Sequence, residues 1–307
     1  MVISISSHES FNPKSFQFQK ELNTYYLNRL AAASQFEDVP SLETQMIFQR
    51  MERIWNAFEQ SLVDTSALPE TIEEFLPWYR NVHKHHRDHI APFFEYIAHD
   101  ASVQEIAYYI AMEEQVDGRF DDVIALAQLG LNGDMKLALA ENYWDEMGNG
   151  ALSQMHTTLF CDSARYMRQF LDRKHENTPV PAEALANDNV ILMYALNRQF
   201  CARLLGVLAI LEHTAPYRFS RTVRGMQRCG IPNNVIYYHD LHIKVDADHG
   251  KDLLERVLLP LMDSAPHVLR EVCLGCMIRL NVGEPDFGAA PAVRDAVTRV
   301  AQGPTPY

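Results

Sequence analysis

Apolar residues recur at spacings of three and four along most of the chain, as in amphipathic helices, whereas strand-like alternation is hard to find. The pattern predicts two N-terminal helices over Pro13–Gln35 and Ser41–Val63. Further helices are expected from Thr71 onward and over Ser102–Phe120, Met135–Leu171, Asn189–Pro216, Tyr217–Cys229, Asn234–Met262 and Val268–Leu280. We therefore expect an all-α protein.

Capping and breaking residues set the expected helix limits. Thr71 to Glu74 and Ser102 to Glu105 both have the spacing of a capping box, which begins a helix. Pro92 predicts a break or kink, because proline removes a backbone donor within a helix. Pro216 is expected to close the long apolar helix before it.

The chain has no internal repeat, low-complexity tract or long linker. We expect residues 1–70 to form N-terminal helices packed on the same domain as residues 71–307, which would carry the main helical bundle. A short terminal helix and a tail with Pro304 and Pro306 are expected to end the chain.

Composition narrows the classes of partner. The 307 residues are 47% hydrophobic and 22% charged, with a net charge of -13, which fits a globular protein and disfavours nucleic acid and anionic membranes as partners. No signal peptide or transmembrane run is recognisable. Five scattered cysteines favour reduced thiols and a cytoplasmic location, and the Cys273/Cys276 pair reads as part of an apolar helix.

The stretch Tyr237–Lys251 carries His242, Asp246 and His249 at offsets of zero, four and seven. On a helix these three side chains project from one face. Two imidazoles and a carboxylate suit a redox metal such as iron. The alternative is a solvated helix face whose histidines bind nothing, since Lys244 and other polar residues share the stretch.

Acidic residues also interrupt other apolar stripes. Glu212 falls on the inward stripe of a long apolar helix, where an unpaired carboxylate would be costly. Glu113 falls on the stripe of the helix that begins at Ser102, with Glu114 and Asp121 as nearby alternatives.

A further acid and histidine lie within one predicted helix. Glu146 and His156 are ten residues apart, about 80° out of register on an ideal helix, and Asp145 matches His156 better. Gly148 and Gly150 predict an irregularity that could remove the mismatch, so periodicity leaves both acids open.

Taken together, these residues resemble the inward-facing ligands of dinuclear metal sites in helical proteins. Any one of these residues alone could be an isolated polar group in the core or part of a surface ion pair. That explanation is weaker for seven such residues together on apolar helices. The set is Glu113, Glu146, His156, Glu212, His242, Asp246 and His249.

Three segments resemble the haem-oxygenase-like diiron oxidases and oxygenases, a family of iron-containing redox enzymes. They are ENYWDEMGNG followed by His156, LLGVLAILEHTAP with Glu212, and YYHDLHIKVDADHG. The resemblance covers about Tyr79 to Leu261 and implies a haem-oxygenase-like bundle with two non-haem irons in its core, O2 as co-substrate and no haem.

The resemblance also implies ligand roles. It favours Glu146 over Asp145, and it implies six core ligands: Glu146, His156, Glu212, His242, Asp246 and His249. It places His242 on one iron and Asp246 and His249 on the other. Members that oxygenate nitrogen have an extra carboxylate from an earlier helix, for which Glu113 is the candidate.

The activity implied is O2-dependent N-oxygenation of a small amine or amino-acid-derived substrate in natural-product biosynthesis, with an electron donor and a homodimer as expected partners. Desaturation or C–C cleavage of a fatty or amino acid is the first alternative. A metal-binding helical protein without turnover is the second. The histidine cluster that contains His85 and His89 is interpreted as a solvated helix face.

Overall fold

The computed structural model describes residues 12–32, 34, 40–171 and 180–282, and this part of the chain is helical with no β-strand. The predicted all-α class is confirmed. The expected terminal helix and tail lie outside the described residues. The α-helices are α1 (Phe16–Arg29), α2 (Leu42–Ser61), α3 (Ile72–His99), α4 (Val103–Asp117), α5 (Phe120–Ala127), α6 (Gly133–Glu146), α7 (His156–Met167), α9 (Ala182–Leu196), α10 (Cys201–Arg228), α11 (Asn233–Asp252), α12 (Leu259–Ser264) and α13 (Leu269–Val282).

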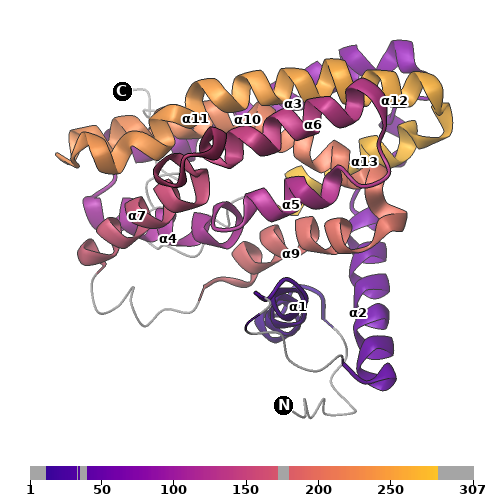
Figure 1. Cartoon of the computed structure of the whole chain (residues 1–307), viewed down its shortest axis with the longest axis horizontal. Helices are drawn as coiled ribbons and strands as arrows, with labels where there is room; N and C mark the ends of the chain where they lie inside the picture. The colour runs from indigo at the N-terminus through magenta and orange to yellow at the C-terminus, as the bar shows by residue number, and fades with distance from the viewer. Residues whose placement is uncertain (1–11, 33, 35–39, 172–179, 283–307) are drawn as a thin grey trace, which may run out of the picture.

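Helix α10 is the central element of the bundle. It packs against α3, α11 and α13, and α3, α6, α10 and α11 lie along the long axis of the molecule in Figure 1. Most of its side chains from Leu204 to Ala215 are buried. A helix that is apolar around most of its circumference is stable only inside a core, which explains its position.

Two glycines allow α13 to approach α10 closely. A Cβ at Gly206 would lie 2.2 Å from the Val272 carbonyl oxygen, and one at Gly275 would lie 2.1 Å from the Arg203 carbonyl oxygen. Neither contact is sterically allowed, so the two helices can pack at this distance only because both positions lack a side chain.

The expected helix end at Pro216 was wrong, and Pro92 does not break its helix. Pro92 lies within α3 and Pro216 within α10, so both helices continue past the expected breaks. Proline costs a helix about 3 kcal/mol, an amount that burial of neighbours such as Phe93 and Phe94 can offset. The expected helix Asn189–Pro216 instead divides at Asn197, where α9 has ended and the backbone is extended.

The N-terminal helices pack on the bundle through polar as well as apolar contacts. In Figure 1, α2 stands across the long axis, and α1 is seen end-on below α9. Asn23 on α1 donates to Asp188 at 2.9 Å and to Asn189 at 3.0 Å, both on α9. Arg119 forms an ion pair with the same Asp188 at 2.9 Å. This buried network joins α1 to both α9 and the α4–α5 turn.

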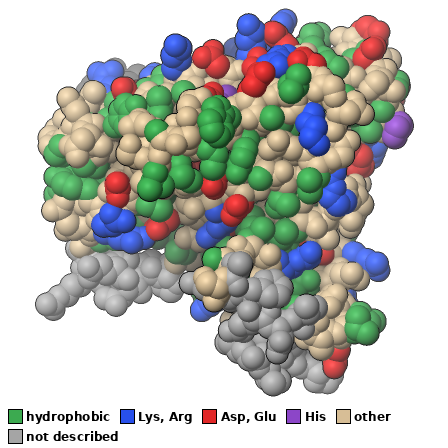
Figure 2. Space-filling model, in the orientation of Figure 1, with side chains coloured by type: hydrophobic (Ala, Val, Ile, Leu, Met, Phe, Trp, Pro, Cys, Tyr) green, Lys and Arg blue, Asp and Glu red, His purple; other side chains and the backbone are tan. Residues whose placement is uncertain are grey.

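Over the described residues, no helix is both long enough and apolar enough to cross a lipid bilayer. Acidic and basic side chains are interspersed over the face in Figure 2, with hydrophobic side chains between them. The expected core position of Cys273 and Cys276 is confirmed, because both are fully buried thiols.

Candidate metal centre

The helical spacing that motivated a metal site is present in α11. His242, Asp246 and His249 are all buried on one side of the helix, each less than one-tenth exposed. Lys244 and Asp248, which share the stretch, are exposed on the other side. The three candidate ligands therefore lie on the buried face of α11, and the charged residues between them lie on its solvated face.

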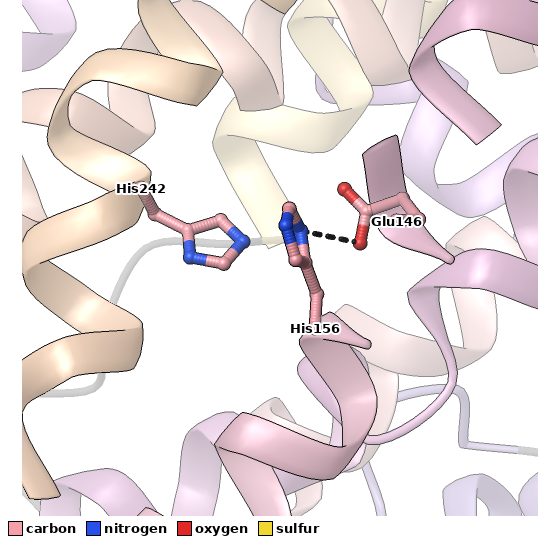
Figure 3. A group of neighbouring side chains, drawn as sticks. All are labelled: Glu146, His156 and His242. Carbon is pink, nitrogen blue, oxygen red and sulfur yellow. Dashed lines mark ion pairs between the residues drawn. The ribbon is translucent and has the colours of Figure 1, made fainter. Parts of the chain in front are cut away.

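The first group of donors combines three helices. Glu146 comes from the end of α6, His156 from the start of α7 and His242 from the middle of α11, and one donor atom of each lies within 4.8 Å of the others. Figure 3 shows the His156 ring between the Glu146 carboxylate and the His242 ring. The Nδ1 atom of His156 is 3.0 Å from a Glu146 oxygen, and the two imidazole centres are 4.5 Å apart.

The loop between Glu146 and His156 makes this meeting possible. The chain leaves α6 after Glu146 and enters α7 at His156, so the expected single helix is wrong, although the expected irregularity is present. Asn149 has φ of 52° and Gly148 has φ of 60°, and a Cβ at Gly148 would lie 2.3 Å from the Gln154 carbonyl carbon. The turn therefore requires glycine and removes the 80° mismatch of an ideal helix.

The second group contains Glu212, Asp246 and His249, again with one donor atom of each within 4.8 Å of the others. The Nδ1 atom of His249 is 3.9 Å from Glu212 Oε1. Asn142 supports the group from α6, donating through Nδ2 to Glu212 Oε1 at 3.5 Å. The structure thus brings all six expected core ligands together as two buried groups of three.

Hydrogen bonds fix the tautomers of two histidines. His242 donates from Nδ1 to the Tyr238 carbonyl oxygen at 2.7 Å, which leaves Nε2 as the free donor atom. His249 donates from Nε2 to Asp145 at 3.3 Å, which leaves Nδ1 free. Metal-binding histidines are commonly held this way by their second nitrogen. Asp145, the alternative to Glu146, therefore contacts a candidate ligand instead of joining either group.

Within the two groups, two buried nitrogens lack hydrogen-bond partners among the described residues. They are His156 Nδ1, which is near Glu146 but not in hydrogen-bond geometry, and His249 Nδ1. Buried polar atoms are rarely left unsatisfied in native proteins, and an ion is one standard explanation. Together with the carboxylate and imidazole donors, the two free nitrogens fit a pair of divalent iron ions.

The electrostatics of the ion-free site point the same way. Burial raises the pKa of Glu212 to about 7. Burial, together with the charges of Glu212 and Glu146, holds the pKa of Asp246 well above its usual value. Burial lowers the pKa of His242 to about 3, so that this imidazole is neutral and able to bind a cation. Cations between the groups would relieve the repulsion among the carboxylates.

Glu113 lies outside both groups. It accepts from the Tyr109 hydroxyl at 2.5 Å, lies 3.2 Å from His239 Nε2, and lies 3.9 Å from Arg218. Of its two named alternatives, Glu114 forms an ion pair with Arg168 near the surface. These contacts satisfy the Glu113 carboxylate within the protein.

The other alternative, Asp121, and Asp117, an acid that the sequence did not single out as a ligand, interact electrostatically with residues of the two groups. The pKa of Asp121 is raised by burial and by the charges of Asp122 and Glu146. Asp117 has a pKa well above its usual value because of burial and the charge of Glu113, and its own charge raises the pKa of Asp246. Asp117 follows Glu113 by four residues, so helical spacing places it on the same stripe and could have identified it.

A buried arginine also lies near this side of the site. Arg279 on α13 is 7% exposed, and its Nε atom has no hydrogen-bond partner. Burial and the charge of Arg218 lower its pKa to about 9. The same two arginines, after burial, help to lower the pKa of His86 to about 3.

The solvated-face interpretation of the histidine cluster is correct only in part. His85 and His89 are exposed, but His86 is buried at 8% exposure. The cluster therefore lies at the edge of the buried side of α3. The polar residues around it gave no sign that one of its histidines is buried.

The family of the chain follows from a comparison with known proteins. A family model described as an iron-containing redox enzyme matches residues 107–284, more than half of the chain and all six residues of the two groups. No curated protein matches the chain. The match confirms the resemblance inferred from the three segments, and the chain belongs to this family of iron-containing redox enzymes.

Proposed function

We propose that the protein is a non-haem diiron oxygenase in which each group of three residues binds one iron. The observation that carries this proposal is the pair of buried groups, each with carboxylate and imidazole donors, which share one buried face of α11. Iron so bound would supply the redox chemistry of O2 activation, in keeping with the iron-containing family.

The protein's own residues set the conditions for that chemistry. His242 and His249 present one nitrogen each because their other nitrogens are hydrogen-bonded. Three carboxylates oppose most of the charge of two divalent ions, and buried aromatic residues such as Phe219 and Tyr238 line the His242 side and exclude water. A dry site keeps reactive oxygen species away from solvent.

The substrate proposed is a small amine or amino-acid-derived compound of natural-product biosynthesis, oxidised at nitrogen. Arg218 and Arg279 support a substrate that also carries a carboxylate, because a buried guanidinium with a free Nε is a suitable anion partner. Oxygenation of the amine would consume one O2, two electrons from a donor and two protons, and would release a hydroxylamine and water.

Oxidation at carbon, giving desaturation or C–C cleavage of a fatty or amino acid, is the second candidate. The observation in its favour is that Glu113, the expected extra carboxylate, is engaged by Tyr109 and His239 and lies outside both groups. Nitrogen oxygenation by the route implied by the resemblance would need Glu113, Asp117 or Asp121 to join the centre.

Single turnover tests the proposal. Protein reduced and loaded with Fe(II) under anaerobic conditions is mixed with ¹⁸O2 and a panel of amines, amino acids and fatty acids. A product with one ¹⁸O on nitrogen supports N-oxygenation, whereas an alkene or cleaved product without label on nitrogen supports carbon oxidation. Bound iron with no product from any substrate class would favour metal binding without turnover.

Glu113→Gln separates the two chemistries. If Glu113 joins the centre, the variant should lose N-oxygenation while it still binds two irons. Unchanged product and O2 consumption would show that Glu113 is not the extra carboxylate. Glu114→Gln, which changes the neighbouring exposed acid, is the matched control.

A further inference from the structure

A small pocket opens beside the second group of donors. It has a volume of about 130 Å³ and lies between α6 and the end of α11, next to the π-helical turn Leu253–Leu258. The lining residues that matter here are Glu141, Asn142, Asp145, Asp248, His249 and Asp252. The pocket therefore joins exposed acids at the surface to a candidate iron ligand.

The size of the pocket limits what it can hold. A water molecule occupies about 30 Å³ of liquid, so the pocket has room for about four waters. Sites for organic ligands are usually larger than about 300 Å³. A hydrated or partly hydrated metal ion fits the pocket, whereas a substrate of ordinary size does not.

The outer wall carries unbalanced negative charge. Arg256 forms ion pairs with Glu141 at 2.5 Å, with Asp252 at 3.1 Å and with Asp134 at 3.0 Å, so its single positive charge is shared among three carboxylates at the rim. Asp145 accepts from His249, and Asp248 has no ion pair among the described residues. Figure 2 shows acidic and basic side chains next to each other along the upper edge of the molecule.

The inner wall offers an unused oxygen. Asn142 is 4% exposed, and it donates through Nδ2 to Glu212 while its Oδ1 has no hydrogen-bond partner. The same side chain therefore contacts the second group and lines the pocket. Neutral and charged oxygens that lead from surface to centre are the ligands that a hard divalent cation prefers.

We propose that this pocket is the entry site for divalent cations, where Asp145, Asp248 and Asn142 Oδ1 hold an ion before it passes to Glu212, Asp246 and His249. The inference rests on the metal centre of the proposed function but not on its reaction. Arg256 opposes entry, because its positive charge lies at the rim and offsets part of the negative charge of Glu141 and Asp252. Metal loading would then depend on residues that are not ligands of the loaded centre.

The test follows uptake of Co(II) by the metal-free protein, using the visible absorption of bound cobalt in a stopped-flow instrument. Asp248→Asn should slow uptake about fivefold at low salt, the factor that Coulomb's law in water gives for a divalent ion passing about 8 Å from one carboxylate. Arg256→Gln should accelerate uptake by a similar factor. Both effects should shrink in high salt.

The matched control is Asp240→Asn, which makes the same charge change on the exposed side of α11, outside the pocket. It should leave the rate unchanged. Asn142→Leu, which removes the inner oxygen and keeps the branching at Cγ, should slow uptake even in high salt. The three charge variants, at Asp248, Arg256 and Asp240, should bind the same final amount of cobalt as the wild type.

Two different results would contradict the entry site, and they can be told apart. Equal uptake rates for the Asp248, Arg256 and Asp240 variants would show that ions enter elsewhere, with the metal centre intact. Failure of the wild type to bind Co(II) would instead overturn the metal centre itself.

Discussion

At the scale of single residues, hydrogen bonds outside the two groups decide which atoms the ligands present. Asp145 is the clearest case, because it holds His249 Nε2 at 3.3 Å and leaves Nδ1 facing Glu212. Its carboxyl also has a pKa below the usual value, chiefly because of this hydrogen bond. Asp145 thus positions a ligand without being one.

Asp145→Asn should weaken metal binding by about tenfold, the lower end of the usual effect of losing a carboxylate behind a metal-binding histidine. The measurement is competition for Co(II) against a chelator of known affinity. Asp162→Asn, which removes an exposed carboxylate paired with Arg165, is the control and should bind normally. Identical affinities for the two variants would argue against a positioning role.

Asp188 is predicted to make stability depend on pH. Burial raises its pKa from 3.8 to about 7, so the folded protein binds the extra proton between about pH 4 and 7. The stability linked to that proton is fully present below about pH 4 and is lost as the pH rises to about 7.

Asp188→Asn replaces the titrating carboxyl group by an amide that does not titrate. From pH 4 to 8 its unfolding free energy should rise relative to the wild type by up to about 4 kcal/mol, because a pKa shift of one unit corresponds to about 1.4 kcal/mol. Urea unfolding at several pH values measures the difference. A constant difference across this range would contradict the raised pKa.

At the scale of helices, the contact between α10 and α13 depends on glycine. Gly206→Ala would place a methyl group 2.2 Å from the Val272 carbonyl oxygen, and backbone on both helices would have to move. We expect a loss of about 3 kcal/mol in unfolding free energy, at the upper end of overpacking effects.

Gly230→Ala is the control for this prediction. Its φ of 73° is unfavourable for alanine, but no atom lies within 4 Å of the added carbon, so the cost should be only about 1 kcal/mol. Chemical denaturation compares the two variants. A smaller loss for Gly206→Ala than for Gly230→Ala would contradict the close packing of α10 and α13.

The same scale shows what the sequence could predict. His242, Asp246 and His249 share one helix, so the 3.6-residue period alone placed them on one buried face. Glu146 and His156 meet through a glycine-dependent turn, whose path no periodicity determines. Arg279 comes from α13, and its proximity to Arg218 depends on how two helices pack. Contacts within a helix were therefore predictable, and contacts set by turns or packing were not.

At the scale of the whole molecule, the N-terminal helices and the region matched by the family are joined by buried contacts. The match begins at residue 107, yet α1 bonds to α9 through Asn23, and α2 supplies Asn56 to Arg203 on α10. Trp55 and Met51 on α2 are fully buried. Whether residues 1–70 belong to the same domain remains a prediction, and it concerns whether they unfold together with the rest of the chain.

We expect the full chain to unfold in one calorimetric transition. Removing residues 1–64 should expose apolar surface of α9 and α13 and lower the melting temperature, because both helices lose buried contacts. Calorimetry of the full chain and of the truncated variant measures both effects. Separate melting of the N-terminal helices, or an unchanged melting temperature after truncation, would show an independent unit.

The central claim is that two neighbouring groups of three residues bind a pair of irons. The most direct measurement is Mössbauer spectroscopy of protein titrated anaerobically with ⁵⁷Fe(II) and then exposed to O2. The account predicts saturation at about two irons per chain and a magnetically coupled diferric spectrum, lost in both His156→Ala and His249→Ala. Saturation at one iron, or a spectrum of uncoupled ferric ions in the wild type, would contradict it.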